Sequence, residues 1–481
     1  MENPAAKRSI TNVLWAYTSF LSTKVLNLVA IIIVARYLGP AEFGLMAICL
    51  SLMVYFDILA QFGLGSALIS SRDDVEETAS AVLACGLAFS CVLAGLLWLG
   101  SGAIATFYGE AILRDLLRVI ALALVVRSLT MVNDALLFRE LRFRARVVPD
   151  VVRGLTKGLV TIGLAVSGFE VWALVYGYLA SAVAGSLALV VMRPWYPTRR
   201  PTRDSARYVL GYGSNLLGAE SINAVPRILD NLLIGKVLGP AALGLYSLAF
   251  RISELGMKTF TSVTGAVLHP VMSTIQNDPA ALRDYYYGAL RYCALIMFGV
   301  GGAIAILAEP VVRVLYTPEW YGMVAPMQLI AVAFAIGTLN MVPGKLLKAV
   351  RRTDLLFRVS LMNLPFFVVL IWLSVPYGIV AVSWIQVLLA VLRFLPTYWI
   401  TKRVMDVNAA DTLSALLPGA TCAGAASVAA LWSLQVEASA LGSLLLGAGV
   451  YAATYLVVVR LTVPEAVTTV VELLGRRRRV A

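Results

Sequence analysis

The stretch ARYLGPAEFGL, residues 35–45, returns 200 residues later as GKVLGPAALGL, residues 235–245. Leu-Gly-Pro-Ala and Gly-Leu are identical in the two copies, and a basic residue precedes each copy. A second block, VIALALVVRSLTMVNDALLFRELR at 119–142, aligns without gaps with LIAVAFAIGTLNMVPGKLLKAVRR at 329–352, an offset of 210. Two blocks in the same order with nearly equal offsets indicate that the chain is a duplication.

The composition shows that the solvent for most of this chain is lipid. Of the 481 residues, 60% are hydrophobic and 14% are charged, and the mean hydropathy is +0.84. An average soluble domain has about 25% charged residues, and surface-to-volume scaling leaves much of any domain exposed to water. The composition therefore excludes a cytosolic enzyme, a secreted domain and a disordered protein.

Apolar windows predict an all-α polytopic membrane protein with about 14 transmembrane helices, since a span takes roughly 20 to 25 residues and a helix satisfies its own backbone in lipid. The connections must be short, and no soluble domain fits between the spans. The predicted helices are 12–37, 42–68, 79–106, 113–138, 149–168, 171–192, 208–236, 242–272, 286–308, 323–348, 356–375, 378–400, 412–433 and 440–461.

The duplication predicts two six-helix lobes, residues 1–200 and 201–405, followed by two additional helices and a basic tail at 406–481. Six is an even number, so both lobes enter the membrane from the same side and are related by an axis along the membrane normal. Two such lobes around a central cleft form the architecture of an alternating-access transporter. The alternative is a duplicated scaffold without a transport pathway.

The loop charges predict that both termini are cytoplasmic, because cytoplasmic loops carry an excess of Lys and Arg. The net charge of +12 follows from these loops and does not call for nucleic acid. The acidic segment 71–77 falls in the cytoplasmic set, but acidic residues carry little weight in this rule. The basic loops contain Lys7, Arg8, Arg139, Arg142, Arg144, Arg146, Arg193, Arg199, Arg200, Arg203, Arg207, Arg351, Arg352, Lys402, Arg403 and Arg476–Arg479.

Charges inside spans are costly and usually face a cavity or a partner. Four cations are therefore predicted to line the cavity and bind an anionic ligand: Lys24, Arg127, Arg227 and Arg251. The alternative for Arg227 is structural, because Asp230 lies three residues later and can neutralise it. Arg153 and Lys157 lie near a predicted cytoplasmic helix end, where snorkelling to the surface explains them.

Three carboxylates in the seventh and eighth predicted helices, Glu220, Asp230 and Glu254, are candidates for binding a coupling proton or Na⁺. The single histidine, His269, cannot build a metal site alone, so no metal is predicted. Nucleophile elbows, zinc-protease motifs and Walker loops are absent from the sequence. We therefore expect a transporter without a cofactor, and not an enzyme.

The motif ARYLGPAEFGLMAICLSL, the segment FGLGSALI at 62–69 and the run ILDNLLIGKVLGPAALGLYSLAFRI at 228–252 resemble the polysaccharide transporter flippases of the MOP superfamily. Within that superfamily they are most similar to the colanic-acid and exopolysaccharide exporters. The resemblance covers residues of about 10–400 and implies a flippase in the bacterial cytoplasmic membrane. Its implied substrate is an oligosaccharide repeat unit on undecaprenyl pyrophosphate, and its implied partners are membrane lipids and polysaccharide polymerase or assembly proteins.

Three other functions remain open at this point. A multidrug/cation antiporter of the same superfamily would favour acidic and aromatic cavity residues, which suit cationic drugs. A lipid II flippase would share the polyprenyl diphosphate chemistry. An integral-membrane glycan polymerase or ligase would need a large external loop with catalytic residues, and the external segment at 309–323 is too short to fold alone.

Overall fold

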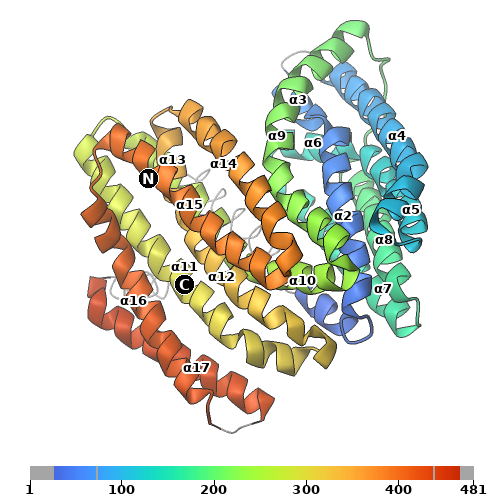
Figure 1. The fold of residues 1–481 in the computed structure, drawn as a ribbon. Coiled ribbons are helices and arrows are strands. Elements are labelled where there is room, and N and C mark those ends of the chain that lie inside the picture. The colour runs from blue at the N-terminus through green and yellow to red at the C-terminus, as the bar shows by residue number, and fades with distance from the viewer. Residues whose placement is uncertain (1–26, 72–73, 437–438, 466–481) are drawn as a thin grey trace, which may run out of the picture. The chain divides into compact units, whose positions relative to one another are not determined.

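The computed structural model describes residues 27–71, 74–436 and 439–465, and within these ranges the regular structure is helical throughout (Figure 1). The predicted all-α class is therefore confirmed. The chain divides into two compact units, residues 1–244 (unit 1) and residues 245–481 (unit 2). Helix α10, Gly239–Thr274, begins in unit 1 and continues into unit 2.

Unit 1 contains the helices of the first repeat and the long helix that follows it. Two of these helices have side-chain caps: Asp74 accepts hydrogen bonds from the first backbone N–H groups of α4, and Thr202 forms a capping box with Ser205 at the start of α9. The helices are α2 (Pro40–Gln61), α3 (Leu64–Ser70), α4 (Val75–Tyr108), α5 (Ile112–Ser128), α6 (Met131–Arg139), α7 (Phe143–Val166), α8 (Glu170–Met192) and α9 (Arg203–Val237).

Unit 2 is built around α11, on which the last two helices pack (Figure 1). The hydroxyl of Tyr451 donates a hydrogen bond of 2.8 Å to the carbonyl oxygen of Gly299 and so joins α17 to α11. The elements after α10 are α11 (Pro279–Leu315), η1 (Pro318–Met323), α12 (Val324–Leu339), α13 (Met341–Ala349), α14 (Thr353–Ser374), η2 (Val375–Tyr377), α15 (Ile379–Met405), α16 (Ala409–Ser433) and α17 (Ala440–Thr462).

Nine helical segments of the described chain are long and apolar enough to cross a membrane, counting α2 with α3 and the 3-10 turns with their neighbours. Four more predicted spans are present as helices: α5 with α6, α7, α9 and α10. The first predicted span, 12–37, lies mostly outside the described residues. The total of 14 spans therefore stays a prediction that the observed helices agree with.

The repeat at offset 210 is visible in the backbone. Helices α6 and α13 have the same length, and the chain turns after both through a residue in the left-handed region, Leu141 with φ 55° and Arg351 with φ 60°. In both turns the next residue donates its backbone N–H to the carbonyl oxygen five residues earlier. The distance is 3.0 Å from Arg142 to Leu137 and 2.8 Å from Arg352 to Leu347. Residues other than glycine rarely adopt this left-handed conformation, so its presence at the ends of both helices supports the duplication.

Helices α7 and α8 approach each other closely because glycines face the contact. A β-carbon at Gly177 would lie 1.9 Å from Oγ1 of Thr161, and one at Gly185 would lie 2.2 Å from Cγ of Arg153. No larger residue fits at either position without a shift of the neighbouring side chain. This packing sets the positions of the polar side chains that α7 and α8 contribute to unit 1.

The connection between the repeats is held by the acidic segment 71–77. Arg199 forms an ion pair with Asp74, and the indole N–H of Trp195 donates a hydrogen bond of 2.9 Å to the carboxylate of Glu76. The acidic segment and the basic connection therefore lie on the same side of the membrane, as the predicted topology requires.

The compact units do not follow the boundary between the repeats. Helix α9 packs on α2, α3 and α4, so residues 203–237 belong to unit 1, whereas the repeat starts the second lobe at residue 201. The parts predicted from the repeat, 1–200, 201–405 and 406–481, describe the duplication and stay predictions as domains.

Candidate functional site

The predicted cavity cations differ in how far the structure describes them. Lys24 lies outside the described residues, and so does the side chain of Arg227 on α9. Arg251 is exposed on α10 within unit 2. Arg127 on α5 makes a set of polar contacts within unit 1, and these contacts define the candidate site.

The guanidinium of Arg127 joins three helices. Its Nη1 donates to Oδ2 of Asp57 on α2, in an ion pair that spans 70 residues of sequence. The same nitrogen lies 3.5 Å from the hydroxyl oxygen of Tyr178 on α8. The side chain of Asp57 is 15% exposed and that of Arg127 is 41% exposed. The side chain of Asp57 is thus more enclosed than that of Arg127.

The depth of Arg127 in its predicted span bears on what its side chain can contact. The residue lies near the middle of the span formed by α5 and α6, where contact of a cation with hydrocarbon is costly. Snorkelling to either surface is difficult from that depth. We therefore keep Arg127 as a predicted cavity cation.

A second cation lies close to the pair. The Nζ atom of Lys157 on α7 is 5.9 Å from the ring centroid of Tyr178. Lys157 lies near the middle of α7, as it does in the predicted span 149–168. Its interpretation as a residue that snorkels to the surface stays a prediction. Arg153, by contrast, pairs with Asp150 at 3.0 Å.

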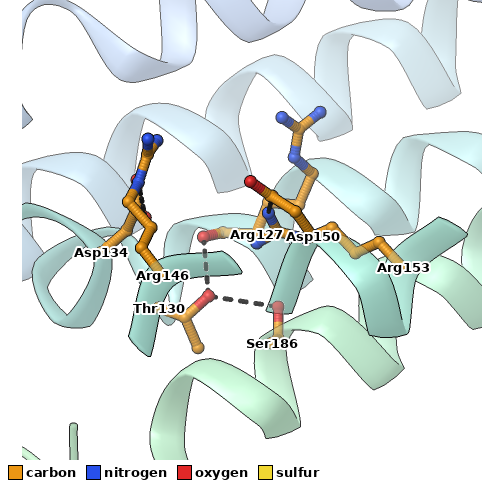
Figure 2. A network of polar contacts seen from close by, with 7 residues as sticks. All are labelled: Arg127, Thr130, Asp134, Arg146, Asp150, Arg153 and Ser186. Carbon is orange, nitrogen blue, oxygen red and sulfur yellow. Dashed lines mark hydrogen bonds and ion pairs between the residues drawn. The ribbon is translucent and has the colours of Figure 1, made fainter. Parts of the chain in front are cut away.

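Polar groups continue from Arg127 along α5 and α6 (Figure 2). The hydroxyl of Thr130 lies 3.4 Å from the carbonyl oxygen of Arg127 and 3.1 Å from the hydroxyl of Ser186 on α8. Beyond the break between α5 and α6, Asp134 accepts two hydrogen bonds from Arg146, at 2.8 Å from Nε and 3.3 Å from Nη2. The whole network carries both signs of charge, with cations from α5 and α7.

The predicted coupling carboxylates are only partly described. The side chain of Glu220 lies outside the described residues, and Glu254 is half-buried on α10. Asp230 is 3% exposed, and its carboxylate accepts a hydrogen bond of 2.8 Å from the backbone N–H of Asn231. The amide of Asn231 in turn donates to Ser51 at 3.0 Å, which ties α9 to α2. None of these contacts tests a role in ion coupling.

The lysine of the DNLLIGK run has a structural contact. The Nζ atom of Lys236 donates to the carbonyl oxygen of Phe107 and lies 4.5 Å from the ring centroid of the same residue. It thereby satisfies a carbonyl at the carboxyl end of α4, where a cation is favourable. This part of the motif holds α9 against α4.

Asp57 is the site residue that sequence reasoning missed. The signal was present, since Asp57 is an acidic residue within a predicted span, but nothing in the sequence pairs it with a residue 70 positions away. Groups of three or more His, Cys, Asp or Glu side chains that could hold a metal do not occur among the described residues. The group of the candidate site whose chemistry suits an anion is the guanidinium of Arg127.

Comparison with known proteins places the chain among proteins of polysaccharide synthesis. Residues 33–325 match the family described as polysaccharide biosynthesis protein. The succinoglycan biosynthesis transport protein ExoT of Rhizobium meliloti (strain 1021) is 25% identical over 315 residues, which cover 66% of this chain and 64% of ExoT. The teichuronic acid biosynthesis protein TuaB of Bacillus subtilis (strain 168) is 21% identical over 405 residues, 84% of each chain. The lipopolysaccharide biosynthesis protein WzxC of Escherichia coli (strain K12) is 22% identical over 361 residues, 73% of this chain and 72% of WzxC.

Two solved structures share the fold. The lipid II flippase MurJ in an inward closed conformation superposes with a TM-score of 0.78 at 12% identity, over 95% of this chain and 100% of MurJ. An inward-facing multidrug resistance MATE family transporter of the MOP superfamily superposes with a TM-score of 0.61 at 16% identity, over 80% of this chain and 96% of the transporter. At these identities the likeness concerns the fold.

Proposed function

The chain belongs to the polysaccharide biosynthesis protein family, and we propose on this premise that it is a flippase for undecaprenyl-pyrophosphate-linked oligosaccharide repeat units. It moves them across the cytoplasmic membrane for the synthesis of an exopolysaccharide, capsule or O-antigen. The printed names of the relatives support this substrate class, since one is a succinoglycan transport protein and others belong to teichuronic acid and lipopolysaccharide biosynthesis.

One observation carries the proposal: Arg127 is a partly open cation near the middle of a span, with Lys157 close by. A diphosphate is the charged part of the proposed substrate, and a guanidinium binds phosphate oxygens through its planar set of donors. The sugar and the diphosphate occupy a wetted space beside α5, while the polyprenyl chain stays in the lipid. Lys24, Arg227 and Arg251 are proposed as further cations along the same path.

The transport cycle that we propose is alternating access, in which the two repeats, related by an axis along the membrane normal, rock against each other. A proton or Na⁺ gradient drives it, with Glu220, Asp230 and Glu254 as the candidate coupling carboxylates. Both termini lie in the cytoplasm, and polysaccharide polymerase or assembly proteins act on the flipped product. The protein itself makes and breaks no covalent bond in this proposal.

The second candidate function is a multidrug antiporter. The similarity to the MATE family transporter favours it, but that similarity concerns the fold alone. A site for cationic drugs would present carboxylates and aromatic rings to the ligand. In unit 1 the side chain of Arg127 is more exposed than that of its partner Asp57, which favours an anionic ligand. A lipid II flippase would use the same diphosphate chemistry and differs from our proposal in the sugar.

Deletion of the gene in the source organism tests the proposed function. We expect loss of the exported polysaccharide and accumulation of polyprenyl-diphosphate-linked repeat units that an external glycosidase cannot reach in spheroplasts. Re-expression of the wild-type chain should restore both readouts. Normal export in the deletion strain, or accumulated repeat units that the glycosidase cleaves, would contradict a flippase role.

A further inference from the structure

We propose that Asp57 is an internal counter-anion that competes with the phosphate groups of the substrate for Arg127. The head group enters the site by displacing the Asp57 carboxylate, and the carboxylate returns to the guanidinium when the head group leaves. This inference rests on the proposed function, because it specifies how the same site distinguishes its empty from its loaded state.

The geometry of the pair suits exchange. Asp57 reaches Arg127 through a single contact, from Oδ2 to Nη1, and the hydroxyl of Tyr178 lies near the same nitrogen. Among the described residues, the hydrogen bonds and the ion pair of the Arg127 side chain all use Nη1, and none uses Nε or Nη2. These two nitrogens form one edge of the guanidinium, which matches two oxygens of a phosphate. A diphosphate can therefore bind the open edge first and then replace the carboxylate.

A second pair in the same unit shows the contrast. Arg146 holds Asp134 by two parallel hydrogen bonds, from Nε and from Nη2. That arrangement uses the guanidinium edge that Arg127 leaves open. Paired, bidentate contacts are the stronger and geometrically more specific ones. We therefore assign a structural role to the Arg146–Asp134 pair and an exchangeable role to the Arg127–Asp57 pair.

In the exchangeable pair the arginine is more exposed than the aspartate, as displacement of the aspartate by an incoming anion requires. The side chain of Asp57 is 15% exposed, whereas the side chain of Arg127 is 41% exposed. An incoming anion thus meets the cation and not the carboxylate. If the carboxylate were the open member, it would repel a diphosphate before any contact with the guanidinium formed.

The counter-anion also solves a problem of the empty transporter. An unpaired cation near the middle of a span is costly, and breaking a buried ion pair by removing one partner is strongly destabilising. With Asp57 in place, a carboxylate balances the charge of Arg127 in the empty site. The empty site thereby avoids an unbalanced cation at Arg127.

Binding of inorganic pyrophosphate to the purified full-length chain in lipid nanodiscs tests the inference. Asp57→Asn removes the competitor but keeps the shape, so its Kd for pyrophosphate should fall about tenfold, which corresponds to about 1.4 kcal/mol. Arg127→Gln should abolish binding. The matched control Asp134→Asn should leave the Kd within twofold of wild type. An unchanged or higher Kd for Asp57→Asn would overturn the proposal.

A second measurement uses a variant that keeps the charge, in case Asp57→Asn does not fold. Infrared difference spectra of the wild type should show a carboxylate band that shifts when pyrophosphate is added. Asp57→Glu should move that band and Asp134→Glu should not. A wild-type spectrum without a carboxylate change would show that Asp57 is not displaced.

The binding experiments separate this inference from the proposed function. Pyrophosphate binding that follows the expected pattern, in a chain whose deletion leaves export intact, would contradict the flippase role and support the exchange at Arg127. Loss of export on deletion, with a Kd that Asp57→Asn does not lower, would support the flippase role and refute the exchange.

Discussion

Gly44 and Gly244 each lie against the backbone of the other's motif. A β-carbon on Gly44 would stand 1.7 Å from the carbonyl oxygen of Pro240, and a β-carbon on Gly244 would stand 1.8 Å from the carbonyl oxygen of Pro40. The two contacts are reciprocal at the offset of 200 residues. Both glycines lie near the starts of their helices, Gly44 in α2 and Gly244 in α10. The reciprocal contact agrees with the duplication, and the parallel relation of the two repeats stays a prediction.

Gly44→Ala and Gly244→Ala should each destabilise the protein, because the added methyl group meets backbone atoms that cannot rotate away. Overpacking typically costs about 1–3 kcal/mol of stability. We expect these variants to lose at least as much as the upper value, because the added methyl group meets backbone atoms. Thermal unfolding of the purified protein measures the loss. Gly100→Ala in α4 is the control, since its β-carbon would meet nothing within 4 Å. Equal stability of all three variants would refute the close contact.

Arg127→Ala should lower both membrane abundance and export, because it strands the enclosed carboxylate of Asp57. Removal of one partner of a fully buried pair costs about 3–5 kcal/mol, and we expect a smaller loss here because the Arg127 side chain is 41% exposed. The double variant Arg127→Ala with Asp57→Asn should recover abundance but not export. Immunoblots of membrane fractions and assays of exported polysaccharide separate the two effects. Recovery of export in the double variant would show that Arg127 is structural.

Arg227 and Lys24 are predicted to face the substrate at equivalent depth in the two repeats. Arg227 aligns with Asn27 at the offset of 200 residues, one helical turn from Lys24. Arg227→Ala should abolish export at near-normal abundance, and Arg227→Lys should restore it partly, because lysine lacks the planar fork. Lys24→Ala should also lower export.

The structural alternative for Arg227 gives a different pattern. If Arg227 only neutralises Asp230, which is 3% exposed, Arg227→Ala should reduce abundance, and the further change Asp230→Ala should restore both abundance and export. Abundance and export of the single and double variants decide between the two roles.

Reporter fusions test the topology. Fusions after Arg203 and after Arg479 should report a cytoplasmic location, and a fusion within 309–322 should report an external one. The contacts of Arg199 with Asp74 and of Trp195 with Glu76 require a fusion at residue 73 to agree with the one after Arg203. Opposite signals from these two fusions would contradict the observed contacts, and an external C-terminus would break the 14-span topology.

Periodic and local features of the sequence were sufficient for the architecture. Long apolar runs specify helices in lipid, because an unpaired backbone group in hydrocarbon costs several kcal/mol, so about 20 residues of such a run form a helix regardless of their neighbours. The LGPA motif marked the starts of α2 and α10, and the offset of 210 predicted the matching backbone of α6 and α13. Boundaries were less well predicted, since α7 begins at Phe143, six residues before the expected start.

The candidate site depended on tertiary structure. A charge within a span is visible in the sequence, and Arg127 was identified in that way. Its partner Asp57, the nearby hydroxyl of Tyr178 and the pairing of Asp134 with Arg146 depend on how α2, α5, α7 and α8 are rotated about their axes. That rotation follows from close packing at positions such as Gly177 and Gly185, where atoms from helices far apart in sequence meet. Hydropathy and repeats thus determined which segments cross the membrane, and packing alone determined which charges meet there.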